Sequence, residues 1–479
     1  MTLIRYIITV VLLTAVLPSY GQETISPSLD DYLEMSARNN PEVRALYNQY
    51  LAALEKVPQS GSLPDPQASF GYFPIPMALV EGDQLAEIQV MQMFPWFGTL
   101  KTARNEAAEM AKAKFEMYLS AKADLFYRIK SAWYQMIKLD HEIGLANQNI
   151  ELLESVERVV LVKYGASSSG NDRGDMGSTS PVKPSAAADF SSAGAGMAGM
   201  GAMQAETGQM TSGGMSGMSG TKSMGDRGTS LQDLLRIKME ILEQKAQIAL
   251  LTDRRKTAVT GFNALLNREL TTDVIITDSL QTVPLPYGIK EIADTILSNN
   301  PMLAMLSYEA ESYALMGQKA KKMGLPMFGA GLNYMLIQKR EGNTSMMNGN
   351  NMVMPMVSFS IPVYRKKYNA MQNEARLLEE SARLQSSDLK NNLNVQYRNF
   401  VQNIADAERR IVLYEEMTGL SRNAFTLMLS DFTSAGSGFE ELIRMQSRIL
   451  EYGLRHLEAI TDYNTAVAMA EKLMNSLKY

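Results

Sequence analysis

The sequence predicts a mainly α-helical chain with a small β part, in which one plan of helices and short strands occurs twice. Three observations support this fold class: long stretches without helix-breaking residues, four short segments of alternating hydrophobicity, and landmarks that recur after about 260 residues. The chain has 479 residues, 46% hydrophobic and 20% charged, which is ordinary for a folded protein. Its net charge of −5 argues against a nucleic-acid-binding surface.

Residues 1–21 are expected to be an export signal. Arg5 provides a short basic start, the apolar run Tyr6–Leu17 follows, and Pro18 precedes an expected cleavage before Gln22. The run is too short for a membrane anchor, which needs about 20 apolar residues. We therefore expect an exported protein without a transmembrane helix, either soluble or inserted in a membrane as a β-barrel.

An internal duplication organises the mature chain. The sequence Asn39-Asn40-Pro41 recurs as Asn299-Asn300-Pro301, and Asp233-Leu234-Leu235-Arg236 matches Glu441-Leu442-Ile443-Arg444 at a shorter spacing. The change in spacing means that the first half carries about 60 additional residues. We expect a first repeat over residues 22–270, with an insertion at 166–229, and a second repeat over residues 288–479.

Each half is expected to contain two very long helices joined at a turn. No Gly or Pro interrupts Val363–Thr418, and only Gly144 interrupts Thr99–Tyr164. In the second stretch, apolar residues at steps of three and four share one helix face: Leu389, Leu393, Tyr397, Phe400, Ile404, Ala407 and Ile411. Helices of this length with a narrow apolar stripe pack as coiled-coil hairpins, because no globular core is that deep.

Four short segments alternate with period two, as strands of a sheet with two different faces do. They are Gln67–Phe73, Ala86–Phe94, Met327–Ile337 and Met352–Ile361; the connectors Pro74–Leu85 and Gln338–Asn351 separate the members of each pair. Four strands cannot close a membrane barrel, whereas three chains would supply twelve. The alternative is two small β-hairpins that cap a soluble helical bundle.

Composition argues against several kinds of site. The chain has no cysteine, which excludes disulfides and thiol catalysis. It has two histidines, His141 and His456, each alone in a helical stretch, so a site of clustered imidazoles is not expected within one chain. No acid–base pair, nucleophile triad or phosphate loop occurs in a plausible context, and we expect neither an enzyme nor a bound cofactor.

The insertion is the main outlier in a chain with 34 methionines. Between Ala166 and Thr229 it is a flexible Gly/Ser/Ala tract without Leu or Ile, so core packing does not explain its eight methionines. These are Met176, Met197, Met200, Met203, Met210, Met215, Met218 and Met224. Because thioether sulfur is a soft ligand for Cu(I) and Ag(I), weak and exchangeable metal sites are predicted here. Compositional drift in a linker and oxidation scavenging are the alternatives.

A second set of methionines lies in the expected strands. Met354 and Met356 share a side with Ser358, and Met91 and Met93 align with polar positions. On three chains these side chains would line a lumen with thioethers. Lipid-facing apolar positions are the alternative.

This layout resembles the TolC family of outer-membrane efflux channels over nearly all of the mature chain, and the methionine tract points to its heavy-metal (copper/silver) branch. The resemblance rests on the duplicated Asn-Asn-Pro motif and on two segments that enter the long helices. These segments are Met93-Phe94-Pro95-Trp96-Phe97-Gly98 and Ser358-Phe359-Ser360-Ile361-Pro362-Val363-Tyr364.

The resemblance implies a homotrimer in the outer membrane of a Gram-negative bacterium, with a twelve-stranded β-barrel in lipid and a periplasmic α-barrel of long helices. It implies a conduit without catalytic activity. Its hairpin tips would dock on a periplasmic adaptor protein that belongs to an inner-membrane pump of the resistance-nodulation-division type. The implied docking residues are Tyr164, Gly165, Asp233, Phe432 and Gly438. Many relatives carry a lipidated cysteine, which this chain lacks.

By the same resemblance, acidic residues just past the second tip would narrow the periplasmic entrance. Glu441 is the best match, with Glu440 beside it, and Arg444 stands where some relatives have a second acid. Glu441 and Arg444 are spaced i, i+3, so a solvated salt bridge is the alternative to a pore-lining role.

The predicted function is the exit duct of a tripartite efflux system, passing Cu(I), Ag(I) or another heavy-metal ion from the periplasm to the exterior. Two alternatives stay open. One is a general drug or protein exporter with an incidental methionine tract, and the other is a periplasmic coiled-coil tether without a pore.

Overall fold

The computed structural model describes residues 27–169, 231–276, 278–342, 344, 346–435 and 438–476. The expected export signal at 1–21 and all eight methionines of the tract lie outside these residues. In the part of the chain that the structure describes, no helix combines the length and apolarity needed to cross a membrane.

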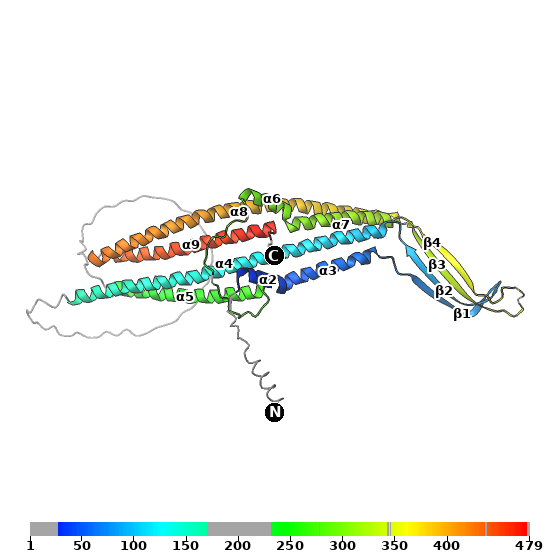
Figure 1. The fold of residues 1–479 in the computed structure, drawn as a ribbon, viewed down its shortest axis with the longest axis horizontal. Coiled ribbons are helices and arrows are strands. Elements are labelled where there is room, and N and C mark those ends of the chain that lie inside the picture. Colours follow the sequence, from blue (N-terminus) through cyan, green and yellow to red (C-terminus); the bar gives the residue numbers. More distant parts are fainter. Residues whose placement is uncertain are drawn as a thin grey trace, which may run out of the picture. The chain divides into compact units, whose positions relative to one another are not determined.

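One order of elements occurs twice along the chain (Figure 1). The first half contains α2 (Leu29–Asn39), α3 (Pro41–Gly61), β1 (Gln67–Leu79), β2 (Gly82–Phe94), α4 (Thr99–Ser169) and α5 (Leu231–Leu265). The second contains α6 (Ile289–Asn299), α7 (Pro301–Met323), β3 (Met327–Gln338), β4 (Met352–Ser360), α8 (Arg365–Ala435) and α9 (Phe439–Met474). The predicted fold class is confirmed, and α4 and α8 are each 71 residues long.

The four strands form one antiparallel sheet in the order β1-β2-β3-β4. The central pair, β2 with β3, joins the first half of the chain to the second. The expected strands are found, but the predicted connector Pro74–Leu85 is wrong, because β1 and β2 continue through most of it. The register shifts between Tyr72 and Met77, around Pro74 and Pro76. Proline lacks a backbone N–H, so it is tolerated at a sheet edge or bulge of this kind.

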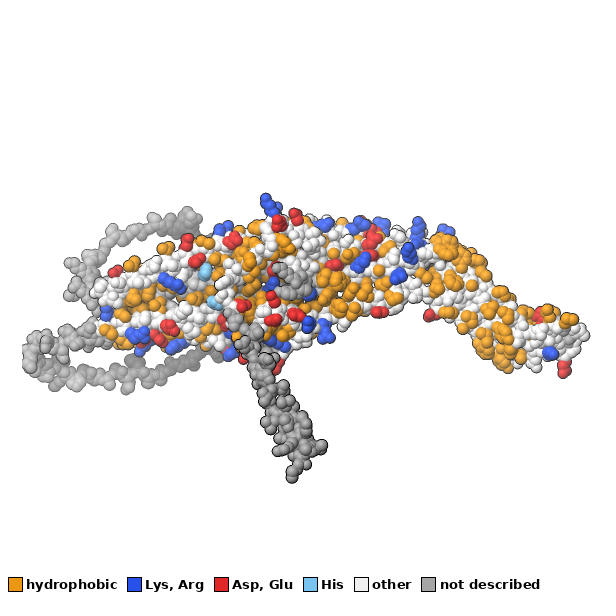
Figure 2. Space-filling view, viewed as in Figure 1, with side chains coloured by type: hydrophobic (Ala, Val, Ile, Leu, Met, Phe, Trp, Pro, Cys, Tyr) orange, Lys and Arg blue, Asp and Glu red, His pale blue; other side chains and the backbone are white. Residues whose placement is uncertain are grey.

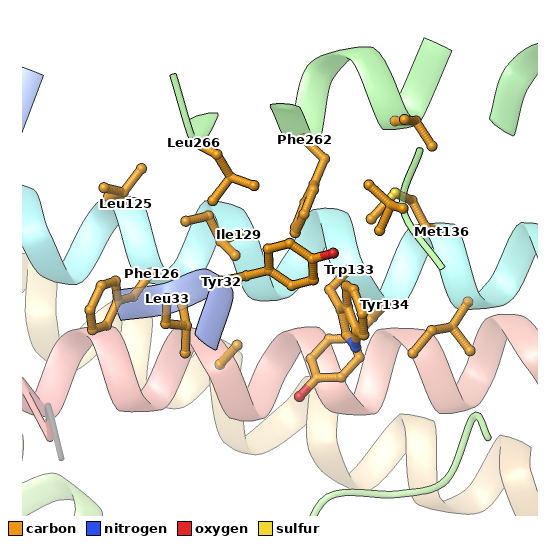
Figure 3. Close-up of a cluster of buried hydrophobic side chains, with 14 of the residues drawn as sticks. Tyr32, Leu33, Leu125, Phe126, Ile129, Trp133, Tyr134, Met136, Phe262 and Leu266 are labelled. Carbon is orange, nitrogen blue, oxygen red and sulfur yellow. The ribbon is translucent and has the colours of Figure 1, made fainter. Parts of the chain in front are cut away.

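The chain divides into two compact units. Within the described residues, the first unit contains 27–148, 246–422 and 447–476, and the second contains 149–245 and 423–446. In the first unit, Tyr32 of α2 packs between Trp133 of α4 and Phe262 of α5, with ring centroids 5.6 and 5.1 Å away (Figure 3). A second cluster joins α6, α8 and α9 and includes Phe400 and Ile404 of the predicted helix stripe. Each half thus buries a short helix against its long ones.

The Asn-Asn-Pro motif explains how each short helix is connected. Asn40 ends α2 and caps α3, since its Oδ1 accepts hydrogen bonds from the backbone N–H groups of Glu42 and Val43. Its Nδ2 donates to the carbonyl oxygen of Leu265 at the end of α5, at 2.9 Å. Proline suits the next position, because the first N–H of a helix has no partner within the helix.

Asn300 makes the same contacts in the second half. Its Oδ1 accepts from the N–H groups of Met302 and Leu303, and its Nδ2 donates to the carbonyl oxygen of Leu473 near the end of α9, at 3.2 Å. Both asparagines are buried. One side chain therefore satisfies two orphan groups at a helix start and one at another helix end, in both halves.

Replacing Asn40 or Asn300 with Ala should lower the free energy of unfolding by about 1–2 kcal/mol, because a helix cap is lost and a carbonyl loses its donor. Thermal denaturation of the purified protein measures the change, and the double variant should show the sum of both effects. Asn39→Ala, which removes the neighbouring exposed side chain, is the matched control. An equal loss for Asn39→Ala would assign the effect to the helix end and not to the cap.

Candidate functional site: a two-faced sheet and a hairpin tip

The register gives the sheet one almost entirely apolar face, because directly paired residues point to the same side. Its residues are Ala68, Phe70, Tyr72, Ala86, Ile88, Val90, Phe94, Phe328, Ala330, Leu332, Tyr334, Leu336, Val353, Pro355, Val357 and Phe359. Gln92 is a polar member, and its amide donates to the backbone carbonyls of Pro64 and Met93. Beyond the register shift in β2, the pair Asp83 and Gln338 lies on the side of Leu336. All of the large apolar side chains except Phe328 are exposed, with Phe70 at 70% and Val357 at 71%. Hydrophobic side chains accordingly cover the surface around the strands in Figure 2.

The opposite face is polar and rich in glycine and methionine, and we call it the polar face. Its polar and glycine members are Gln67, Ser69, Gly71, Glu87, Gln89, Gly329, Gly331, Asn333, Ser358 and Ser360. Glu87 accepts from the amides of Gln84 at 3.3 Å and Asn333 at 3.5 Å. This hydrogen-bonded carboxylate places a negative charge on the polar face.

The register places all four predicted lumen candidates, Met91, Met93, Met354 and Met356, on the polar face. Three further methionines that were not predicted from the sequence share this face: Met327, Met335 and Met352. Met77 pairs with Gln84 beyond the register shift in β1. The period-two alternation along β3 and β4 was the signal for them. The paired positions of the apolar face contain no methionine.

The second unit contains the hairpin tip between α8 and α9. Phe432 is buried and packs against Phe439 with ring centroids 5.9 Å apart. The Lys163 ammonium lies 4.6 Å from the centre of the Phe432 ring and donates to the Phe432 carbonyl oxygen. Phe432 is therefore a packing residue of the tip, and its predicted docking role stays a prediction.

The other predicted tip residues occupy helix ends and the turn. Gly438 has φ +90°, a conformation that strongly favours glycine, and its carbonyl accepts from Leu442 in the first turn of α9. Asp233 lies in the first turn of α5, where a negative charge stabilises the helix. Tyr164 and Gly165 lie within α4, which continues past the expected tip to Ser169.

At the predicted entrance, Arg444 does not form the salt bridge with Glu441 that was the alternative to a pore-lining Glu441. Arg444 Nη2 donates instead to Glu440 Oε1 at 3.2 Å, one residue away from Glu441. The i, i+4 spacing suits this pair, because it brings two side chains one above the other on a helix. Glu441 is exposed and makes no ion pair with another described residue.

The two histidines, expected to be isolated, lie close to one cavity. His141 of α4 and His456 of α9 line the same cavity of about 640 Å³ within the first unit, together with Asp140 and Glu415. The Nδ1 atom of His141 lies 2.9 Å from the carbonyl oxygen of Ile137. Among the described residues, no group of three His, Cys, Asp or Glu side chains is placed to hold a metal ion.

Comparison with known proteins links this fold to membrane channels. No protein-family model and no curated protein matches the chain. Solved structures that match include a membrane protein from Pseudomonas aeruginosa (TM-score 0.67, 11% identity, 93% of each chain). Others are the open Neisseria gonorrhoeae MtrE outer membrane channel (0.65, 13%, 94% of this chain and 89% of that chain) and CusC, which forms a transmembrane channel (0.66, 10%, 94% and 92%). At these identities the likeness shows the fold, which is that of TolC-type channels.

Phe432→Ala should loosen the hairpin tip, because truncating a buried aromatic ring costs about 3–5 kcal/mol. Hydrogen exchange of backbone amides in residues 423–446 should accelerate, while amides of the first unit keep their protection. Leu427→Ala is the matched control on the same helix, since Leu427 is 69% exposed. Similar acceleration in both variants would show that Phe432 does not hold the tip.

Proposed function

We propose that the chain is the outer-membrane exit duct of a tripartite efflux system and works as a homotrimer. The observation that supports this most is the sheet with one exposed apolar face and one polar face, in a chain whose fold is that of outer-membrane channels. The apolar face suits contact with hydrocarbon, and the polar face suits a water-filled lumen.

The sheet is open, with β1 and β4 at its edges. Unpaired edges are not tolerated in lipid, because each unsatisfied backbone group costs several kcal/mol. Pairing β1 of one chain with β4 of the next would close a barrel of twelve strands in a trimer. Strands of 9–13 residues are long enough for this role. The long hairpins would then extend into the periplasm as an α-barrel.

The proposal includes partners at the periplasmic end. The tips between α4 and α5 and between α8 and α9 would meet a periplasmic adaptor and an inner-membrane pump of the resistance-nodulation-division type. The protein would act as a conduit for solutes and not as an enzyme. Its location would be the outer membrane of a Gram-negative bacterium.

Purified trimers should insert into planar lipid bilayers and give stepwise ionic conductance. Ile88→Arg, on the apolar face, should abolish insertion, because a central lipid-facing Arg costs about 2–4 kcal/mol in each chain. Gln89→Arg, on the adjacent position of the polar face, is the matched control and should insert and conduct with altered ion selectivity. Folded trimers that never conduct would favour the tether, and equal behaviour of the two Arg variants would contradict the assigned faces.

We also propose Glu441 as the carboxylate of the periplasmic entrance. It is exposed, whereas Glu440 is engaged by Arg444. Three Glu441 carboxylates near a threefold axis would attract cations. In the same bilayer assay, Glu441→Gln should weaken block by a trivalent cation from the periplasmic side, and Glu440→Gln should change it less. Equal effects would remove the assignment of Glu441.

The cargo that we propose is Cu(I) or Ag(I), captured by the methionine tract at 166–229. Eight methionines in a Gly/Ser background without Leu or Ile are the basis of this assignment. Exchangeable thioether sites favour transfer over storage, as the entrance of a conduit requires.

Replacing the eight tract methionines with Leu keeps size and apolar character and removes the sulfur. The full-length variant should bind fewer Ag(I) ions in calorimetry, and cells should lose metal resistance while drug efflux persists. Unchanged Ag(I) stoichiometry would show that these methionines are not ligands. Lost binding with full resistance would favour the general exporter.

A further inference from the structure

The distribution of methionine in the sheet calls for an explanation based on sulfur. Apart from the rows beyond the register shifts, seven methionines lie on the polar face and none at the paired positions of the apolar face, where Phe, Tyr, Ile, Leu and Val are the large side chains. Methionine is about as apolar as leucine, so a purely space-filling or lipid-facing role would place it on the apolar face as well. A property that the hydrocarbon side chains lack therefore distinguishes these positions.

Two glycines open a space at one end of the polar face. Gly329 and Gly331 of β3 lie between β2 and β4, two strands that are about 10 Å apart at ordinary strand spacing. A Cβ atom at Gly329 would collide with Ser358 Oγ and would lie 2.7 Å from Met93 Sδ. Side chains from both neighbouring strands thus already fill the volume over this glycine.

The sulfurs converge on one hydroxyl group in that space. Ser358 Oγ lies 3.4 Å from Met91 Sδ and 3.8 Å from Met93 Sδ. Met356 of β4 stands opposite Met91 across Gly331, on the same row of the register. Methionine side chains from β2 and β4 can therefore meet over the two glycines, with Ser358 between them.

We propose that Met91, Met93, Met356 and Ser358 form a binding site for a soft monovalent d¹⁰ ion, Ag(I) or Cu(I). We call these four residues the sheet site. Thioethers bind soft, low-charge ions such as Cu(I) without losing a proton, so the three methionines are the ligands and Ser358 lies between them. Neutral sulfur ligands are poor ligands for Na⁺, K⁺ or Mg²⁺, so the site discriminates by chemistry. Glu87 on the same face contributes a negative charge that attracts the cation.

The ordinary alternative is that the four side chains only fill the space above the glycines. Ser358 argues against simple filling, because a hydroxyl aimed at two sulfurs gains a weaker contact than a hydroxyl bound to oxygen. The site rests on the proposed function only for its role in transport, where three copies would line the lumen. Binding itself requires nothing beyond the folded sheet.

The experiment is an Ag(I) titration of detergent-solubilised, full-length trimer in which the eight tract methionines are already Leu. In this background the parent should bind about one Ag(I) per chain, and Met91→Leu/Met93→Leu should raise the Kd by about tenfold or more. The matched control is Met335→Leu/Met352→Leu, which removes two thioethers from the same face away from the glycines, and it should keep the parent Kd.

Gly329→Ala should also weaken Ag(I) binding, because its methyl group occupies the space of Met93 Sδ and Ser358 Oγ. If a variant fails to assemble, silver-edge X-ray absorption on the parent decides, since sulfur neighbours are expected and a shell of oxygen or nitrogen alone would overturn the site. No Ag(I) binding by the parent, or equal losses in the two double variants, would also overturn it. Normal conductance without Ag(I) binding would contradict this site and leave the channel proposal intact. Ag(I) binding without conductance would contradict the channel proposal and leave this site intact.

Discussion

The antiparallel pairing of β2 with β3 is the interaction on which the other functional features depend. It joins the two halves of the chain in one sheet and sets Met91 opposite Gly331 and Gln89 opposite Asn333. Because side chains alternate with a period of two residues, a slip of one residue would put Met91 opposite an apolar-face position and mix the two faces. The separation of an apolar face from a polar face therefore rests on this one register.

The short helices contribute to the stability of the two 71-residue helices, α4 and α8. A single long helix buries little apolar surface, so each half adds a short helix that packs against its long pair. Asn40 and Asn300 connect these short helices to the ends of α5 and α9 with the same set of hydrogen bonds. The duplicated Asn-Asn-Pro motif therefore makes the same hydrogen bonds in both halves of the chain.

Methionine connects the two regions to which we assign metal chemistry. One set lies in a tract whose composition excludes core packing, and the other lies on the polar face where hydrocarbon side chains are scarce. In our proposal the sulfur atom, and not the apolar surface of the side chain, accounts for the methionines in both places. The glycines at 329 and 331 leave room for side chains from neighbouring strands.

The sequence by itself determined the long helices, the four strands, the duplication and the unusual methionine content, since these follow from local patterns of hydrophobicity and composition. It could not decide between lipid-facing and lumen-facing methionines, because the alternation in one strand does not say which face is covered. It also offered a Glu441–Arg444 salt bridge as the alternative to a pore-lining Glu441, whereas Arg444 pairs with Glu440. Only the tertiary structure decided the shared face of seven methionines, the contacts of Ser358 with two sulfurs, the burial of Phe432 and the common cavity of His141 and His456. The register, the sulfur contacts and the cavity join residues that are distant in the sequence, and the burial of Phe432 depends on packing between helices; no local pattern specifies either.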